Sequence, residues 1–227
     1  MRWTGVIRIF VVAVTLLSIW YFAEQMFSIK WEAKSLQSLF GHEEAVVSVL
    51  TKKRPKCGNE KECPENYFAF KMISGAANVV GPSICLEDKI IMSGVKNNIG
   101  RGLNIALVNA TTGETLGTGH YDMYSGDIKE VKAFFEPVKD GTLIFIATYD
   151  DPSTKLDTQT RELLTSYGSS YAKKLGFRDG WLFVGGKGLK NKSPFEQHIK
   201  NNKETNKYDG WPEVLEMDGC IPKKMNQ

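Results

Sequence analysis

Short apolar runs, most of them too brief for helices, recur through the middle of this chain. In the run Leu103–Asn109 (LNIALVN), leucine and isoleucine alternate with other residues, which is the period of a strand with one buried face. Thr142–Tyr149 (TLIFIATY) is apolar almost throughout, which predicts a strand that is buried on both faces. The same pattern predicts further strands at Tyr67–Ile73, Glu114–Tyr121, Trp181–Val184 and Glu213–Met217. The apolar pattern therefore predicts several short strands along the chain.

The stretch Ser74–Asn109 interleaves its apolar segments with glycine, alanine, serine and asparagine. Its run Lys96–Gly102 (KNNIGRG) comes directly before the strand predicted from Leu103. Glycine and asparagine tolerate positive φ angles, so the chain can bend sharply at such a run or approach another segment closely. We expect the remaining strands and helices to pack around this stretch.

Helical signals occur in three segments. Apolar side chains three and four residues apart mark one face of Asp127–Lys139, where a serine or aspartate can cap the first turn. Thr158–Leu175 has the same spacing, interrupted by one glycine. At Ser193–Glu196 (SPFE), serine can cap a helix, proline suits its first position and glutamate can reach back to the cap. This motif predicts a third, short helix that ends near Asn201.

The N-terminal segment has the layout of a secretory signal. Ile9–Ala23 is apolar throughout and follows two arginines. Ala23 suits the last position before a cleavage site, whereas Tyr21 is large for the position two residues earlier. An uncleaved anchor is the alternative, although the run falls short of the ~20 residues of a comfortable membrane span. We interpret residues 1–23 as a signal peptide, or signal anchor, that leads to secretion through the endoplasmic reticulum and Golgi.

The rest of the chain fits a tether and one domain. Residues 24–56 carry mixed charge and end in a basic run, which predicts a flexible tether before a domain at 57–227. The apolar fraction of 42% and the charged fraction of 24% are typical of a globular protein. Arg2 and Arg8 contribute two of the formal net charge of +3, so the charge predicts no nucleic-acid partner. We expect no membrane contact after removal of the signal.

Four cysteines in a secreted chain predict two disulfides, and their positions leave all three pairing schemes open. Cys57 and Cys63 flank a short polar segment, whereas Cys85 and Cys220 lie further along the chain. The spacing of the first two does not fit a zinc knuckle, and no histidine cluster accompanies them. We therefore expect no metal site.

No group of residues has the pattern of a catalytic site. His120 and Asp122 lie two apart on a predicted strand and could pair as acid and base, but a polar strand surface explains them more simply. The glycines at 185–188 (GGKG) lack the spacing of a phosphate-binding loop and the hydroxyl residue after the lysine. Asp150 and Asp151 fit a turn better than a calcium site. We predict a protein without enzymatic activity or cofactor.

Two sequons could receive an N-linked glycan in a lumenal chain. Asn109, which belongs to one of them, lies at a predicted hairpin turn. The second sequon begins at Asn191 and is followed by Pro194, which disfavours modification. Asn109 is therefore the candidate glycosylation site.

Several longer segments resemble the interleukin-like EMT inducer family, the cytokine-like "family with sequence similarity three", whose domain is shared with pancreatic-derived factor. The segments are SGAANVV at 74–80, ICLED at 84–88, SGVKNN at 93–98, FRDGW at 177–181, SPFEQHIKNN at 193–202 and WPEVLEMDGCIP at 211–222. The likeness runs from about Cys57 to the end of the chain. It implies a secreted, non-enzymatic cytokine-like protein that binds a cell-surface receptor and promotes epithelial–mesenchymal transition or regulates metabolism.

The resemblance also implies an α+β, β-rich fold in which two antiparallel sheets pack as a sandwich with flanking helices. It implies that this single domain is stapled by the disulfides Cys57–Cys85 and Cys63–Cys220. Mammalian members of one branch carry a further cysteine where this chain has Val184. We therefore expect a monomer or a non-covalent dimer.

The same domain resembles the GG-type lectin domain, which implies glycan binding as an alternative function. Sugar sites use carboxylate or guanidinium groups for the hydroxyls, beside the face of an aromatic ring. The residues with this chemistry are Arg101, Asp122, Tyr124, Asp127, Arg178, Asp179 and Trp181. Charged turn residues and a buried tryptophan are an equally natural interpretation of the same set.

Overall fold

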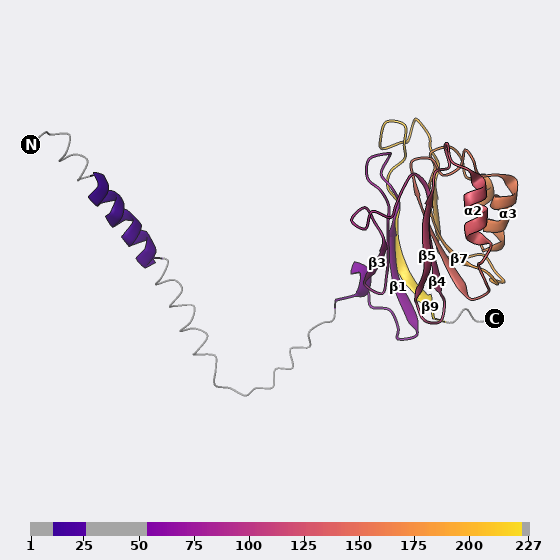
Figure 1. Cartoon of the computed structure of the whole chain (residues 1–227), viewed down its shortest axis with the longest axis horizontal. Helices are drawn as coiled ribbons and strands as arrows, with labels where there is room; N and C mark the ends of the chain where they lie inside the picture. The colour runs from indigo at the N-terminus through magenta and orange to yellow at the C-terminus, as the bar shows by residue number, and fades with distance from the viewer. Residues whose placement is uncertain (1–10, 26–53, 224–227) are drawn as a thin grey trace, which may run out of the picture. The chain divides into compact units, whose positions relative to one another are not determined.

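The computed structural model describes residues 11–25 and 54–223 of the chain, which divides into one unit at 1–52 and another at 53–227. The described part of the first unit is an exposed helix over residues 11–25, which covers residues 11–23 of the predicted signal and the first two residues of the predicted tether (Figure 1). Among the described residues, no helix is both long and apolar enough to cross a membrane. The start of the predicted signal, residues 1–10, and most of the predicted tether, residues 26–53, lie outside the described residues.

Two antiparallel sheets form the second unit, as the predicted fold class requires. The first sheet has the strand order β3-β2-β1-β9, with β1 at Tyr67–Ile73, β2 at Ser83–Leu86, β3 at Lys89–Met92 and β9 at Glu216–Pro222. The second has the order β5-β4-β6-β7-β8, with β4 at Gly102–Asn109, β5 at Thr115–Tyr121, β6 at Thr142–Tyr149, β7 at Gly180–Gly186 and β8 at Glu196–Ile199. Helices α2 (Ile128–Phe135) and α3 (Thr158–Ser166) complete the domain with two short 3-10 turns, η1 (Lys56–Gly58) and η2 (Ala172–Lys174).

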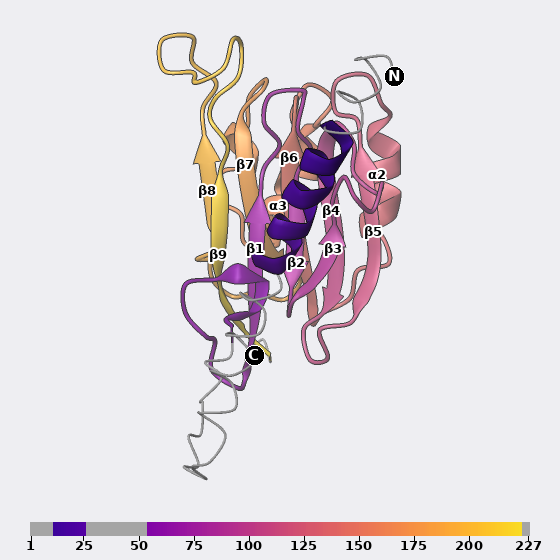
Figure 2. The ribbon, with the colours of Figure 1, turned by 90° about the vertical axis from the view of Figure 1, so that its left-hand side faces the viewer.

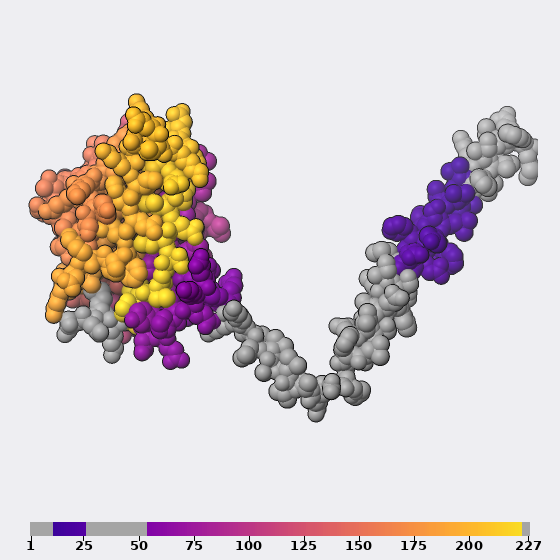
Figure 3. All heavy atoms as spheres, turned by 180° about the vertical axis from the view of Figure 1, so that it is seen from behind, coloured from indigo at the N-terminus to yellow at the C-terminus, as the bar shows by residue number. Residues whose placement is uncertain are grey.

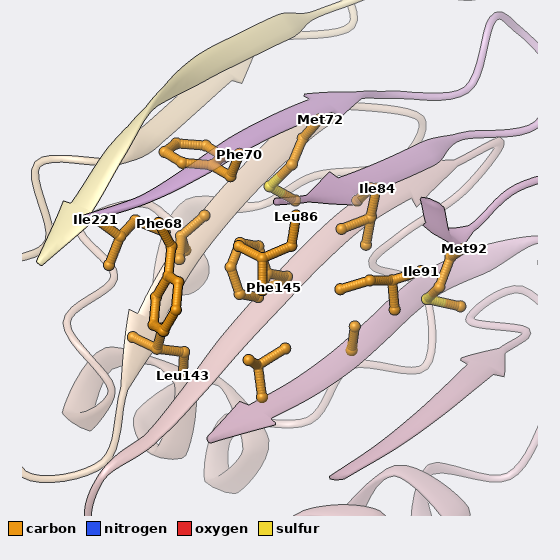
Figure 4. Close-up of a cluster of buried hydrophobic side chains, with 14 of the residues drawn as sticks. Phe68, Phe70, Met72, Ile84, Leu86, Ile91, Met92, Leu143, Phe145 and Ile221 are labelled. Carbon is orange, nitrogen blue, oxygen red and sulfur yellow. The ribbon is translucent and has the colours of Figure 1, made fainter. Parts of the chain in front are cut away.

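The elements form three layers, in which the second sheet lies between the first sheet and the helices (Figure 1). Phe145 of β6 lies between the sheets, amid Phe70, Ile84 and Leu86 of the first sheet (Figure 4). The opposite face of the second sheet, including Trp181, packs against α2 and α3. Strand β6 is therefore buried on both faces, as its continuous apolar pattern predicted. The prediction of one buried face for β4 is wrong, because its other face, which includes Ala106 and Val108, packs against the first sheet.

The first two predicted helices are present but shorter than predicted. The Asp127 side chain accepts a hydrogen bond from the backbone N–H of Lys129 and caps α2, which ends at Phe135. The helix predicted over 158–175 ends at Ser166, because the chain turns at Gly168 with φ +103° before η2 begins. Glycine adopts such an angle without the steric cost of a Cβ atom.

The helix predicted from the Ser193–Glu196 motif is wrong, because this segment leads into strand β8, which pairs with β7. The Ser193 hydroxyl does accept a hydrogen bond from Phe195 N, at 3.1 Å. The Glu196 carboxylate, however, accepts hydrogen bonds from Ser170 N and from the indole N–H of Trp181, at 2.6 and 2.9 Å. Partners distant in sequence thus replace the helical cap that the local pattern offers.

The last strand also differs from the prediction, which placed it at Glu213–Met217. Strand β9 begins at Glu216 and continues to Pro222, and its whole length pairs with β1. The pairing extends past Gly219 to Pro222 because β1 supplies backbone partners on that side.

Two disulfides fasten the N-terminal part of the domain to the first sheet. They join Cys57 to Cys85 and Cys63 to Cys220, the pairing that the family resemblance implied. The β2–β3 turn supports the first of them, because Asp88 Oδ1 accepts a 2.7 Å hydrogen bond from Cys57 N. All four cysteines of the chain are used in these two bonds.

We expect the two disulfides to differ in their contribution to stability. They close loops with sequence separations of 28 and 157 residues. In the chain-entropy model these loops correspond to about 3.6 and about 5 kcal/mol. Urea unfolding should therefore show a lower midpoint for Cys63→Ser/Cys220→Ser than for Cys57→Ser/Cys85→Ser. The reverse order would show that native contacts, not loop length, decide the effect.

Candidate functional site

Most of the candidate residues lie in loops at one end of the sandwich. This end is named the loop edge and comprises residues 74–82, 93–101, 122–127, 150–157, 176–179 and 200–215. These loops leave the upper end of the strands in Figure 2. Figure 3 shows loop 200–215, in yellow, protruding at this end of the molecule. The pairing register of the strands brings these loops together, because β1 and β6 end at the loop edge while β4, β7 and β9 begin there.

Asp150, immediately after β6, lies at the centre of the loop edge. Its Oδ1 accepts a 3.0 Å hydrogen bond from Trp211 Nε1 and lies 3.9 Å from Arg178 Nε. Its Oδ2 lies 3.7 Å from Arg101 Nε. The backbone at Asp150 has φ +60°, a strained conformation that occurs preferentially at functional sites. One carboxylate thus joins three segments that are far apart in sequence.

The Arg178 guanidinium lies against two aromatic rings. Its Cζ is 3.8 Å from the centroid of the Trp211 ring and 4.9 Å from that of Phe177. Gly210, with φ +85°, makes the close approach possible, because a Cβ there would lie 2.9 Å from Arg178 Nη1. Arg178 Nε is buried without a hydrogen-bond partner among the described residues. Ring contacts and the nearby Asp150 carboxylate therefore hold this cation in place.

The segment predicted to bend tightly positions Arg101. Gly102 has φ +87°, and a Cβ there would lie 2.0 Å from the carbonyl oxygen of Tyr121. The fully buried Asn104 side chain exchanges two 2.8 Å hydrogen bonds with the backbone N–H and C=O of Gly100. The backbone on both sides of Arg101 is thereby fixed, and its side chain reaches Asp150 while remaining largely exposed.

Asp151 organises the turn next to the site. Its buried carboxylate accepts hydrogen bonds from Ser153 N at 3.0 Å and Thr154 N at 3.3 Å, so the predicted turn is present. It also accepts a 3.4 Å hydrogen bond from Arg178 N. Asp151 therefore ties the 150–157 loop to the backbone that carries the arginine.

The side chain of Asp179 connects two further loops of the loop edge. Its buried carboxylate accepts hydrogen bonds, each 2.8 Å long, from Gly176 N, Asn201 N and His198 Nε2. Burial acts to raise the pKa of this carboxyl, but the hydrogen bonds from His198, Asn201 and Gly176 outweigh it and lower the pKa. The His198 ring also stacks on Tyr171, with centroids 4.9 Å apart. Asp179 thus holds the 176–179 turn against the start of the 200–215 loop.

Asp122 and Tyr124 lie beside this group. Asp122 accepts hydrogen bonds from Tyr124 N at 2.7 Å and Ser125 Oγ at 2.6 Å. Burial acts to raise its pKa, but these hydrogen bonds and the charge of Arg101 lower it overall. The Tyr124 ring lies 6.4 Å from that of Phe177, and both rings are exposed. The two rings extend the aromatic surface next to Arg178.

The structure separates one of the sequence candidates from the others. Trp181 is completely buried between the second sheet and the helices, so its ring face is closed to a sugar. The other six candidates lie at the loop edge: Arg101, Asp122, Tyr124, Asp127, Arg178 and Asp179. Among them, Asp127 caps α2 with its side chain.

Sequence reasoning missed Asp150 and Trp211 as members of the site. Asp150 carried a signal, the paired aspartates after a strand, but that signal pointed only to a turn. Trp211 stood out only within a family-like segment, and it lies 61 positions after its partner Asp150. Their contact depends on which strand ends share the loop edge, and local patterns do not contain that information.

The arrangement is suited to binding. Two guanidinium groups flank one carboxylate beside aromatic ring faces, a combination that matches hydroxyl or carboxylate groups of a polar ligand. Within the described residues, no hydrogen bond joins His120 to Asp122, which instead bonds its own turn. The described part of the chain also holds no group of three or more histidine, cysteine or acidic residues that could bind a metal ion.

Comparison with known proteins gives full-length relatives. Residues 101–189, which include Arg101, Asp150 and Arg178, match the model of a family described as interleukin-like EMT inducer. Protein FAM3C of Rattus norvegicus is 54% identical over 228 residues, which cover 100% of both chains. Protein FAM3D of Homo sapiens is 50% identical over 224 residues, 99% of each chain. Protein FAM3A of Pongo abelii is 55% identical over 190 residues, 83% of each chain.

Asp179 should make the stability of the domain depend on pH. Because its pKa in the folded state lies below the unfolded value of about 3.9, the ionised carboxylate stabilises the fold above that pH. This contribution is lost as the pH falls through the folded pKa. We expect Asp179→Asn to lower the free energy of unfolding by about 1–3 kcal/mol near neutral pH, with a smaller difference at acid pH. Urea unfolding across that range measures both values.

The exposed residue Asp218 supplies a matched control. Asp218→Asn removes the same charge from a strand surface, and its effect should stay within about 0.5 kcal/mol. An Asp179→Asn variant as stable as the control near neutral pH would contradict the positioning role of Asp179.

Proposed function

The chain belongs to the interleukin-like EMT inducer family, and on that premise we propose that it is a secreted signalling protein that acts by binding a cell-surface receptor, without catalysis. Family membership supports a cytokine-like protein. Promotion of epithelial–mesenchymal transition or regulation of metabolism is the finer assignment that we propose. The observation that carries the proposal is the full-length identity with the FAM3 proteins, which extends over the N-terminal segment as well as the domain.

The chemistry of the domain supports secretion and action by contact. Two disulfides suit an oxidising compartment such as the secretory pathway. The polar side chains of the loop edge are largely engaged in holding loops: Asp151 and Asp179 are buried and fully bonded, and His198 is held between Asp179 and Tyr171. Such groups build a rigid surface, which supports action by contact. We infer a monomer or a non-covalent dimer, because all four cysteines lie in intrachain bonds.

Glycan binding is the second candidate function, and a specific observation favours it. Arg101, Asp150 and Arg178 come together beside the rings of Trp211 and Phe177. The two cations can donate hydrogen bonds to sugar hydroxyls, the carboxylate can accept them, and a ring can pack against the apolar face of a sugar. The arrangement is compatible with a glycan on a receptor as well as with a free one.

We also propose that Asn109 carries an N-linked glycan. Asn109 lies at the end of β4, where its Oδ1 accepts hydrogen bonds from Thr111 N at 2.8 Å and Thr112 N at 3.1 Å. Thr111, the hydroxyl residue of the sequon, is exposed. The β4–β5 turn lies at the end of the sandwich opposite the loop edge, so a glycan there leaves the loop edge uncovered.

Capture from cell surfaces distinguishes the two functions. Labelled secreted protein should bind epithelial cells saturably, and protease treatment of the cells should abolish binding, because a protein receptor is the proposed partner. Survival of binding after glycosidase treatment supports a protein receptor, whereas its loss supports the glycan function. In the glycan case, Asp150→Asn and Arg178→Ala should each weaken binding about tenfold or more, because each removes a charged group of the site.

Arg54→Ala is the control for these variants, because Arg54 is likewise an arginine paired with an aspartate, Asp88, and lies at the opposite end of the domain. Its binding should equal that of the unchanged protein. Absence of saturable binding to any cell tested would contradict the proposed function itself.

Glycosylation at Asn109 has a direct readout. Secreted protein from animal cells should shift to lower mass on treatment with an endoglycosidase, and Asn109→Gln should remove the shift. Asn191→Gln should leave it unchanged, because Pro194 follows that sequon. A shift that persists in Asn109→Gln would contradict the assignment.

A further inference from the structure

Three valines project from the loop edge into solvent. Val79 is 79% exposed, Val80 is 59% exposed and Val95 is 99% exposed. They come from two loops, 74–82 and 93–101, and are named together the valine tip. Single exposed apolar residues are common on protein surfaces, but a group of them within one small area marks an interaction site.

The two loops contact each other through Ile99. A Cβ on Gly81 would lie 2.1 Å from Ile99 Cδ1, and a Cβ on Gly94 would lie 3.9 Å from the same atom. Each of these glycines is the chain neighbour of a tip valine, Val80 or Val95. The two loops are therefore joined at Ile99, which packs against the core between the sheets. The tip valines flank this contact in the sequence, two on the first loop and one on the second.

Hydrogen bonds hold both loops in their exposed positions. Ala76 N donates to Val80 O at 2.8 Å, and Val80 N donates to Ala76 O at 3.2 Å, which closes the first loop. In the second, Asn98 Oδ1 accepts from Ser93 N at 3.1 Å, and Asn98 Nδ2 donates to Ile91 O at 2.9 Å. A surface that is already ordered loses little conformational entropy on binding, so the valines are pre-arranged for a partner.

The valine tip adjoins the Arg178 cluster. Ala77, in the first tip loop, lines a small hollow together with Asp150, Arg178 and Trp211. Gly75 N donates a 2.8 Å hydrogen bond to Thr148 O near the end of β6, which fixes that loop against the cluster. Arginine and tryptophan are enriched among the energetically dominant residues of protein interfaces, and here both lie beside the first tip loop.

The charges of the tip indicate the chemistry of its partner. Loops 74–82 and 93–101 contain no carboxylate, and their charged residues are Lys96 and Arg101. We propose that the valine tip is the receptor-contact surface, and that its partner is a protein presenting an apolar hollow bordered by carboxylates. This proposal rests on the proposed receptor-binding function.

A lipid surface fits the tip less well than a protein does. Segments that insert into membranes carry larger apolar side chains, such as tryptophan, phenylalanine and leucine, with a basic face. Attraction to anionic lipid requires several adjacent cations, whereas loop 74–82 carries none and loop 93–101 carries two, Lys96 and Arg101. Short valine side chains held by tight loops instead suit a shallow apolar hollow of matching shape.

Binding to epithelial cells by labelled full-length protein tests the proposal. We expect Val79→Ser/Val95→Ser to raise the apparent Kd about tenfold or more, because two central apolar side chains are lost from the interface. Lys96→Glu should also weaken binding and slow association, because it opposes the carboxylates of the partner. The exposed side chains contribute little to the core, so both variants should keep the unfolding midpoint of the unchanged protein.

Leu116→Ser is the matched control. Leu116 is 55% exposed on strand β5 and lies away from the tip loops, so its replacement should leave the apparent Kd unchanged. A second arm replaces the cells with vesicles of phosphatidylcholine and phosphatidylserine, which should not retain the protein.

The outcomes separate the proposal from the function on which it rests. Equal binding by the unchanged protein and Val79→Ser/Val95→Ser would overturn the valine tip while leaving receptor binding intact. Retention on vesicles that is lost in the valine variant would overturn the protein partner in favour of lipid. Absence of saturable binding by the unchanged protein would overturn the receptor function and the tip together.

Discussion

The burial of one sheet on both of its faces is the constraint on which the rest of this structure depends. Strands β4 and β6 pack against the other sheet on one side and against helices on the other. Inside such a layer, the backbone polar groups have no access to water and must pair within the sheet. The chain can therefore turn only at the ends of the strands, and the polar side chains collect there. The loop edge is the consequence of this rule at one end of the domain.

The rule also explains why buried polar residues cluster under the loop edge. Asn104, Asp151 and Asp179 are each buried close to a strand end, and each bonds the backbone of a neighbouring loop. A buried polar group without partners would be costly, so the native contacts of each side chain fix the loop that it serves. Arg101, Arg178 and Trp211 then contact Asp150 because these hydrogen-bonded loops hold them in position. The buried polar side chains under the loop edge thus hold the cluster around Asp150 in place.

Sequence patterns predicted the parts of this fold that depend on local periodicity. The apolar run of β6 gave a doubly buried strand, and the spacing after Asp127 gave α2, because burial imposes those periods directly. The motif beginning at Ser193 misled because Glu196 bonds residues distant in sequence. Likewise, Arg101 and Arg178 were recognisable by residue type, but their meeting at Asp150 depends on strand order. The disulfide pairing came only from the family resemblance, since residue spacing left three schemes open.

The Cys63–Cys220 bond has a geometric consequence beyond stability. It lies where β1 begins and β9 ends, and Lys223 N donates a 2.8 Å hydrogen bond to Asn66 O beside it. Figure 3 shows the corresponding purple and yellow segments together at the lower end of the molecule. The first and last residues of the folded body thus emerge at the pole farthest from Asp150. A fluorophore, an affinity tag or a solid support attached at either terminus joins the domain at that pole and leaves the opposite one turned outward.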